Sequence, residues 1–279
     1  ASVNDLRWKD IVNRIYGRID PIAEGGKEYR ENLPNVTVYN GHAKFVDNKV
    51  IEVNGKQLGS QKIVIATGAR PFIPPIPGLS ETSYQTSDSI MRIDSLPKSL
   101  SIIGGGYIAT EIAHIFSSFG CRVNVLARGS RLLRDQDNEI SLRFTESFRN
   151  RVSVHLNVDI QNIFEDKPDG VSISCVTPLG DISHSSEILL VATGRTPTAD
   201  ELDLDSTDVI TDCGYIVTDE TMRTSVDDVF ALGDVTNPHQ LKHSANAEAR
   251  VVSHNLINPD NLISVDLDPM PYTIFSNPQ

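Results

Sequence analysis

The sequence predicts an α/β fold of two domains, one inserted into the other. A strand, a glycine-rich turn, a helix and a second strand follow one another from residue 101 to residue 126. Further apolar strands at 62–66 and 228–232 flank this unit along the chain. The proline-rich run 71–78 and the acidic, turn-rich segment 199–217 indicate the two crossovers between the domains.

The glycine-rich turn follows the apolar strand Ser101–Ile103 and opens a helix that ends at Gly120, before the strand Arg122–Leu126. Gly104 permits the tight turn, and Gly106 lets a pyrophosphate approach the backbone. The start of the helix offers N–H groups and a partial positive charge to phosphate. This context predicts a Rossmann-like dinucleotide site, with simple close packing as the alternative. The turn residues expected at the site are Gly104, Gly106, Tyr107, Ile108 and Ala109.

The loop after the second strand indicates which nucleotide binds. An NAD site usually has an acidic residue there for the ribose 2′-OH, and residues 127–134 contain none. Arg128 and Arg134 instead flank the place of an adenosine 2′-phosphate, which guanidinium groups bind well. The sequence therefore predicts NADP, and the alternative is a solvated basic loop.

The other elements follow from periodicity and turn residues. Before the central unit we expect an amphipathic helix with Trp8, Ile19 and Ile22 on one face, bent or interrupted at Pro21. An Asn54-Gly55 hairpin turn and a short helix capped by Ser87 follow. The remaining predicted elements are strands at 36–39, 42–46, 50–53, 152–156, 171–176 and 188–192, and helices around 140–148 and 243–256.

Composition excludes several classes of protein. The net charge is −12 without any basic block, so neither a nucleic-acid partner nor an anionic membrane surface is expected. No apolar run is long enough to span a bilayer. Cys121, Cys175 and Cys213 are odd in number and far apart, which predicts inert buried thiols in a reducing cytoplasm. No catalytic residue and no metal ligand is predicted.

Four motifs in this order resemble the flavin-dependent pyridine nucleotide–disulfide oxidoreductases, the family of glutathione reductase and dihydrolipoamide dehydrogenase. They are Ala66-Thr67-Gly68, Gly104–Ala109 with Glu111, Ala192–Pro197 and Ala231–Asp234. The resemblance covers essentially the whole chain. It implies a Rossmann-like NADP-binding domain, residues 83–198, inserted into a partial FAD-binding α/β domain, residues 1–82 and 199–265. Residues 266–279 would begin a dimerisation domain.

The resemblance also implies roles for single residues. Tyr107 would cover the nicotinamide pocket, Glu111 would lie beside the nicotinamide, and Gly194 would close over the bound NADPH. Asp234 would bind the ribityl chain of FAD, and His243 would lie near the flavin, with a helix-terminal histidine bonded to backbone as the alternative. The residues implied for FAD are Ala43, Thr67, Gly68, Arg195, Gly233, Asp234, Leu241, Lys242 and His243.

Two features of the family are absent from the sequence. No G-x-G-x-x-G precedes residue 104, and no Cys-x4-Cys redox pair is present, so we expect a longer, homodimeric parent protein. The parent would reduce a low-molecular-weight disulfide with NADPH and FAD, whereas this chain alone would only bind a nucleotide. The alternatives are a dihydrolipoamide dehydrogenase, or a flavin transhydrogenase or oxidase if the parent lacks the cysteines. The sequence most resembles one disulfide-reducing branch of the family. The stretches that carry this likeness are Tyr84–Ile93, Ala113–Ser117 and Gln240–Asn246.

Overall fold

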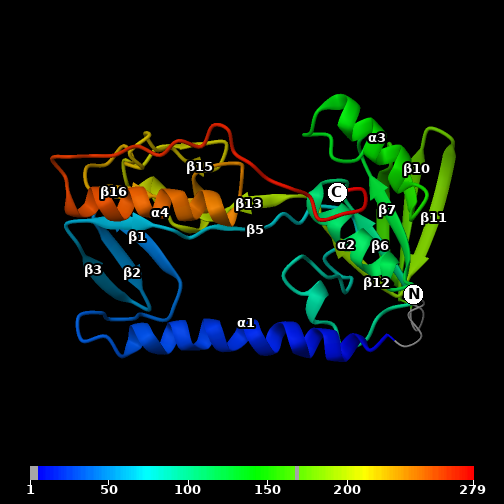
Figure 1. The fold of residues 1–279 in the computed structure, drawn as a ribbon, viewed down its shortest axis with the longest axis horizontal. Coiled ribbons are helices and arrows are strands. Elements are labelled where there is room, and N and C mark those ends of the chain that lie inside the picture. The colour runs from blue at the N-terminus through cyan, green and yellow to red at the C-terminus, as the bar shows by residue number, and fades with distance from the viewer. Residues whose placement is uncertain (1–5, 167–169) are drawn as a thin grey trace. The chain divides into compact units, whose positions relative to one another are not determined.

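The structure is a computed structural model that describes residues 6–166 and 170–279 (Figure 1). The chain divides into two compact units. Unit 1 comprises the described residues up to Gly26, Pro71–Gly194 and Thr273–Gln279, and unit 2 comprises Lys27–Arg70 and Arg195–Tyr272. The first five residues of the predicted range 1–82, and residues 167–169 of the predicted range 83–198, lie outside the described residues.

Unit 1 is built on a parallel sheet of four strands in the order β12-β6-β7-β8 (Figure 1). The chain passes from β6 through α2 to β7, and from β7 through α3 to β8, whereas β12 pairs with the other side of β6. The strand order thus reverses beside β6, where open α/β sheets bind ligands. The predicted α/β fold is confirmed. The bounds are β6 Ser99–Ile103, α2 Tyr107–Ser118, β7 Arg122–Ala127, α3 Asn138–Phe148, β8 Ser153–Leu156 and β12 Ile188–Val191.

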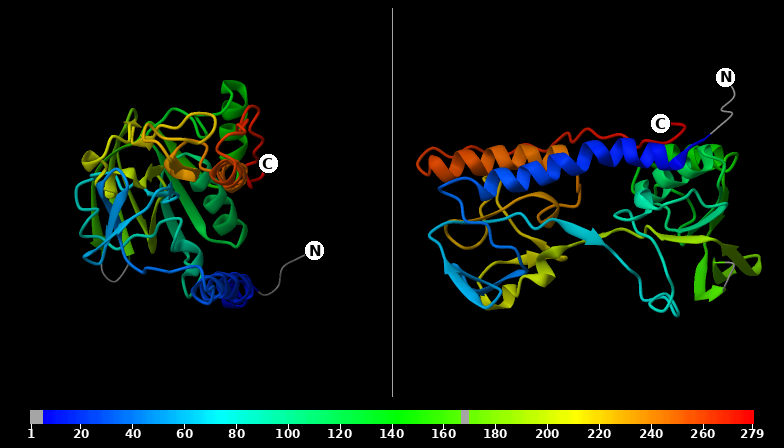
Figure 2. Two further views of the ribbon diagram at one scale, coloured as in Figure 1. Left: turned by 90° about the vertical axis from the view of Figure 1, so that its left-hand side faces the viewer. Right: turned by 90° about the horizontal axis from the view of Figure 1, so that it is seen from below.

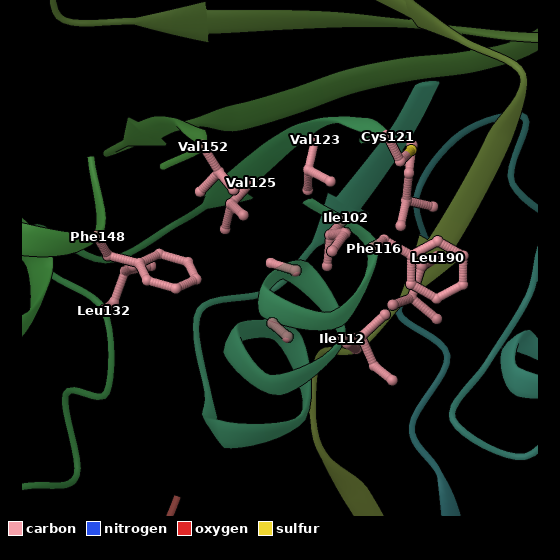
Figure 3. Close-up of a cluster of buried hydrophobic side chains, with 14 of the residues drawn as sticks. Ile102, Ile112, Phe116, Cys121, Val123, Val125, Leu132, Phe148, Val152 and Leu190 are labelled. Carbon is pink, nitrogen blue, oxygen red and sulfur yellow. The ribbon is translucent and has the colours of Figure 1, made fainter. Parts of the chain in front are cut away.

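The core of unit 1 joins this sheet to its helices (Figure 3). Ile102, Val125 and Leu190, from three neighbouring strands, are fully buried. Ile112 and Phe116 lie one helical turn apart on α2 and belong to the same cluster. Burying a side chain of this size stabilises the fold by ~1.5–3 kcal/mol. The cluster therefore fixes α2, and the turn before it, relative to the sheet.

A second, antiparallel sheet in unit 1 has the order β11-β10-β9. Only its middle strand was predicted. Ile160 and Ile163 of the first strand are three residues apart, and the register shift opposite Ser174/Cys175 leaves Gln161 as an extra residue. The bulge therefore hides the two-residue alternation by which a strand is recognised. The bounds are β9 Asp159–Asp166, β10 Gly170–Thr177 and β11 Gly180–Ser186.

The first and the last described segments both pack on unit 1. Helix α1, Trp8–Glu31, passes Pro21 without interruption (Figure 2, blue). The ring of Trp8 lies 5.3 Å from that of Phe116, and its Nε1–H donates to the Ile93 carbonyl. Near the other end, Ile274 packs against the core of unit 1. The compact units therefore differ from the predicted domain ranges at residues 6–26, 71–82, 195–198 and 266–279, and the assignment of cofactors to those ranges stays a prediction.

Unit 2 combines short sheets with one long helix, α4. Its parallel pair β4–β16 ends at Ile65 and Ala231, and the N–H of Leu232 continues the pairing to the Ile65 carbonyl. The predicted hairpin at Asn54-Gly55 is confirmed, because both residues have a positive φ between β2 and β3. The bounds are β1 Ala43–Asp47, β2 Val50–Val53, β3 Lys56–Gly59, β4 Ile63–Ile65, β5 Ala69–Pro71, β13 Arg195–Pro197, β14 Thr211–Asp212, β15 Tyr215–Ile216, β16 Val229–Ala231 and α4 Lys242–Ile257.

Three predicted elements are wrong. Residues 36–39 are exposed and form no strand in the described chain. The helix expected after Ser87 is only the single turn Ile90–Arg92, because Thr86 and Ser89 use their hydroxyl groups to bond nearby backbone N–H groups. The single apolar face of α1 is also wrong, since Ile19 and Ile22 are exposed.

The three cysteines differ in accessibility. Cys121 and Cys175 are buried, and burial raises the pKa of each thiol to about 11. Cys213 is exposed, so the prediction of three buried thiols is wrong at this position, which lies in a turn with a φ of 50°. A hydrogen bond to Asp212 raises the pKa of the Cys213 thiol as well, so exposure is what distinguishes this cysteine. We expect iodoacetamide to alkylate Cys213 alone in the native chain at pH 8, because the reagent can reach only this one of the three thiols. Peptide mass spectrometry checks this, and native labelling of Cys121 or Cys175 would contradict it.

Residues 6–166 and 170–279 contain neither a membrane-spanning helix nor a metal-binding cluster. No helix there has the length and apolar character needed to cross a membrane. No group of three or more His, Cys, Asp or Glu side chains in the same residues is arranged to hold a metal ion.

Candidate functional site

The glycine turn of unit 1 lies at the end of β6, next to the end of β12. Gly104 has a φ of 132°, and a Cβ built on it would overlap the carbonyl oxygen of Ala192. The N–H of Ala192 donates to the Ile103 carbonyl, which holds the two strand ends together. Gly104 is therefore required by the fold itself.

Gly106 is free of any such constraint. Its φ of −83° suits every residue, and a Cβ built on it has no heavy atom of the described chain within 4 Å. It is the N-cap of α2, where no side chain caps the helix and the first turn carries no acidic residue. The start of α2 is thus open to an anion. Of the other turn residues, Tyr107 is exposed, Ile108 is half-buried, and Ala109 is fully buried, which lets α2 pack closely on the sheet.

The arginine loop is tied to this turn. The N–H of Leu133 donates to the Gly105 carbonyl at 2.7 Å, and a Cβ on Gly105 would lie only 3.2 Å from Leu132 Cδ2. On its other side, the N–H of Asn157 donates to the Gly129 carbonyl. The sequence did not indicate that Gly105 matters, because its role depends on a loop that is distant in the chain.

Two arginines of this loop are exposed. Arg128 forms no hydrogen bond or ion pair with any described residue. Arg134 has a side chain that is 63% exposed and only a long contact, 3.8 Å from its Nε to Asp135 Oδ1. Arg131 lies between them and donates from Nη2 to the Arg134 carbonyl at 3.3 Å. The loop thus presents guanidinium groups beside an open helix start, which fits the phosphates of NADP.

Two more predicted residues of unit 1 are held by nearby backbone. Gly194 has a φ of 125°, and its carbonyl accepts from the N–H of Phe72 at 2.9 Å, while Thr193 Oγ1 donates to the Phe72 carbonyl. Glu111 is half-buried on α2, and its Oε1 accepts from the N–H of Phe275 at 2.9 Å. The chain thus gives Glu111 a backbone partner.

In unit 2, a buried carboxylate supports the predicted Gly233-Asp234 turn. Glu248 on α4 is 1% exposed, and it accepts from the N–H of Gly233 at 2.5 Å and from Asn237 Nδ2 at 2.6 Å. Burial raises the pKa of Glu248, and the Gly233 N–H only partly opposes this. Asp234 is half-buried and has no hydrogen bond or ion pair within the described residues. Glu248, which the sequence did not single out, thus holds the turn that presents Asp234.

We expect Glu248→Gln to lower the free energy of unfolding by ~1–3 kcal/mol, because either amide orientation turns an NH2 group toward a donor. Because folding raises the pKa of Glu248, binding a proton there adds to the free energy of unfolding. This contribution is complete below pH 4.5, the ordinary pKa of the group, and is lost as the pH rises through the raised pKa. Urea unfolding from pH 4 to pH 8 measures both effects. Glu220→Gln, at an exposed position, is the matched control. Equal stability of the two variants would contradict the role of Glu248.

The remaining predicted residues lie at two places in unit 2. Lys242 and His243 are exposed at the start of α4, where Leu241 is the N-cap and no side chain caps the helix. In the described chain His243 makes no hydrogen bond to backbone, so the structure does not show the alternative proposed for it.

At the second place, β5 pairs with β13, so Gly68, which directly precedes β5, lies near Arg195 at the start of β13. Arg195 Nη2 donates to the Ala69 carbonyl at 2.5 Å, and Thr198 Oγ1 donates to the Gly68 carbonyl at 3.0 Å. Thr67 is exposed. Ala43 is half-buried and pairs with Val53 in the β1–β2 hairpin.

Comparison with known proteins defines the class. The pattern of the pyridine nucleotide-disulphide oxidoreductase family matches residues 9–250. The chain belongs to this family, which is FAD-dependent and uses a pyridine nucleotide.

Named relatives narrow the comparison. Mycothione reductase of Mycobacterium tuberculosis (strain ATCC 25618 / H37Rv) is 40% identical over an alignment of 289 positions, which covers 100% of this chain and 62% of that protein. Mercuric reductase of Shigella flexneri is 35% identical, over 100% of this chain and 50% of that protein. The solved structure of HOCl-induced flavoprotein disulfide reductase RclA from Escherichia coli matches with a TM-score of 0.86 and 27% identity, covering 98% of this chain and 62% of that chain. The chain thus spans less than two thirds of these relatives.

Proposed function

We propose that the whole protein is an NADPH-dependent flavoprotein that reduces a small-molecule disulfide. The observation that carries this proposal is the hydrogen bond between Leu133 and Gly105, which holds the arginine loop at the glycine turn. The pyrophosphate would bind at Gly106 and the start of α2, and the 2′-phosphate at Arg128 and Arg134. Glu111 and Tyr107 would orient the nicotinamide, and Gly194 would close over it.

Unit 2 would bind part of FAD. The carboxylate of Asp234 has no partner within the described residues and would accept hydrogen bonds from the ribityl hydroxyls. The uncapped start of α4, at Leu241, Lys242 and His243, would direct positive potential at the flavin. Ala43, Thr67, Gly68 and Arg195 would line the adenine side. When bound, the two cofactors supply the electron transfer, and the protein positions them.

Mycothione is the disulfide that we propose as the substrate. Mycothione reductase is 40% identical over the whole chain, and the stretches Tyr84–Ile93, Ala113–Ser117 and Gln240–Asn246 resemble that branch of the family. The whole protein would act as a homodimer in the cytoplasm, with residues 266–279 leading into the dimerisation domain.

Steady-state assays of the whole, FAD-loaded protein test the substrate. We expect NADPH oxidation to be faster with mycothione than with glutathione disulfide, Hg(II) or lipoamide at equal concentration. Faster turnover of Hg(II) or lipoamide would contradict the proposed substrate.

We expect the 279-residue chain alone to reduce no disulfide and to retain little FAD, because its sequence contains neither the Cys-x4-Cys pair nor a second G-x-G-x-x-G turn. The visible absorption spectrum of the purified chain checks this. A yellow protein with one FAD per chain would contradict it.

A further inference from the structure

A second basic site lies at the opposite edge of the unit 1 sheet from the glycine turn. A cavity of about 770 Å³ opens there, and among the residues that line it are Ser99 at the start of β6, Arg122 at the start of β7 and Ser153 at the start of β8. The glycine turn and the arginine loop follow the carboxyl ends of the same strands. The two sites are therefore distinct.

The charged side chains that line this cavity in the described chain are all basic. Arg122, Arg149 and Arg151 line it, and no acidic side chain is among its lining residues in the described chain. The whole sequence has 37 acidic and 25 basic residues, so a cavity lined by three arginines and by no described acidic side chain is not explained by composition.

The three guanidinium groups also have almost no hydrogen-bond partners among the described residues. Arg122 and Arg149 form no side-chain hydrogen bond or ion pair with the described residues, and Arg151 makes only a 3.4 Å hydrogen bond to Ser118 Oγ. The acidic residue Glu187 lies near the lining residue Cys121, whose pKa is raised by burial and also by this charge, but Glu187 accepts from the backbone N–H of Lys98 at 2.8 Å and forms no ion pair with these arginines in the described chain. The arginines thus keep nearly all of their donors for a ligand.

A histidine in the cavity wall adds a further unused group. His155 lines the cavity, and its ring lies 4.2 Å from that of His184, on β11. The Nε2 atom of each ring is buried without a hydrogen-bond partner in the described chain. Buried polar atoms of this kind normally have a partner, so a bound ligand or water is expected at these rings.

We propose that this cavity binds a small polyanion that carries phosphate groups. Several guanidinium groups in one concave site match phosphate oxygens in both charge and geometry. The net charge of −12 disfavours nucleic acid, whose binding needs a basic surface. Asn124, Asn150 and Ser185 offer further polar groups in the same wall. This inference is independent of the disulfide substrate.

Calorimetric titration of the 279-residue chain with inorganic pyrophosphate tests the proposal. The Gly106→Ala variant is the starting protein, because the glycine turn is itself expected to bind pyrophosphate and the added methyl group should block binding there. We expect one equivalent to bind this variant at low salt. Adding Arg149→Gln and Arg151→Gln should weaken the affinity by roughly tenfold or more, the loss expected from removing a charge-assisted hydrogen bond.

The charge-matched control is Arg14→Gln/Arg18→Gln, at two exposed positions on α1 without hydrogen bonds or ion pairs to described residues. This control should leave the affinity unchanged. No binding, or an equal loss in the control, would overturn the proposal. Tighter binding of citrate than of pyrophosphate would overturn the phosphate assignment.

Amide chemical shifts locate the bound anion. In the chain that carries all of its arginines, pyrophosphate should move the amide signals of Asn124, Ser153 and Ser185, which line the cavity. This measurement needs no arginine variant, so it tests the site even if such a variant unfolds. Shifts confined to the turn Gly104–Ala109 would overturn the second site.

Discussion

The 279-residue chain should bind NADPH roughly 30- to 1000-fold more tightly than NADH, a difference of ~2–4 kcal/mol. A hydrogen bond to a charged group contributes ~1.5–3 kcal/mol, and the exposure of Arg128 and Arg134 reduces the sum of two such contacts. The double variant Arg128→Ala/Arg134→Ala should remove the preference and leave the affinity for NADH nearly unchanged. Calorimetric titration with both reduced nucleotides measures each quantity.

Single arginine changes should each remove less than half of the preference, because Arg131 lies between the two positions. The preference should also fall as salt is added, since exposed charges are screened. Arg14→Gln, on α1, is a control for charge alone, because Arg14 is exposed and has no hydrogen bond or ion pair through its side chain with described residues. Equal affinities for the two nucleotides in the unmodified chain would mean that the loop is only a solvated basic surface.

Two glycines of the turn should respond to alanine in opposite ways. Gly104→Ala places a Cβ against the Ala192 carbonyl at a φ of 132°, so we expect the free energy of unfolding to fall by ~3 kcal/mol or more. Gly106→Ala places its Cβ in open space, so stability should change by less than about 1 kcal/mol. The same methyl group should block the pyrophosphate and weaken NADPH binding by roughly tenfold or more.

Urea unfolding and NADPH titration of both variants separate these effects. Gly17→Ala, in α1, is the control for a glycine replaced in open space away from the turn. A Gly106→Ala chain that binds NADPH as tightly as the unmodified chain would contradict the placement of the pyrophosphate at this residue.

The central part of unit 1 could be predicted because its signals are local. Ser101–Ile103 and Ile188–Ala192 are short apolar runs, and β6 and β12 lie there with at most two residues of difference at either end. The helix expected at 243–256 is α4, Lys242–Ile257. In each case one apolar pattern and one adjacent turn determine the element.

Elements that depend on distant partners could not be predicted. Strand β11 has Ile182 as its only large apolar residue, and it forms because β10 supplies a complete antiparallel partner. The burial of Trp8 depends on Phe116, far along the chain. Hydrophobic periodicity alone therefore predicts that Ile19 and Ile22 share the buried face of α1, although only Trp8 and Val12 of this helix pack against the core of unit 1 in the described chain.

The candidate site shows the same division. The turn and the two arginines stand out in the sequence because glycine spacing and a missing acidic residue are local features. Two supporting contacts are single hydrogen bonds, one between Glu248 and Gly233 and one between Leu133 and Gly105. No motif in the sequence indicates that these residues meet. Such contacts require the folded structure.

The glycine turn and the arginine loop of unit 1 should together bind NADPH. A crystal structure of the chain with bound NADP tests it most directly. We expect the pyrophosphate at Gly106 and the start of α2, and the 2′-phosphate within ~3.2 Å of guanidinium nitrogens of Arg128 and Arg134. A nucleotide bound elsewhere on the chain, or a 2′-phosphate that points into solvent away from both arginines, would contradict it.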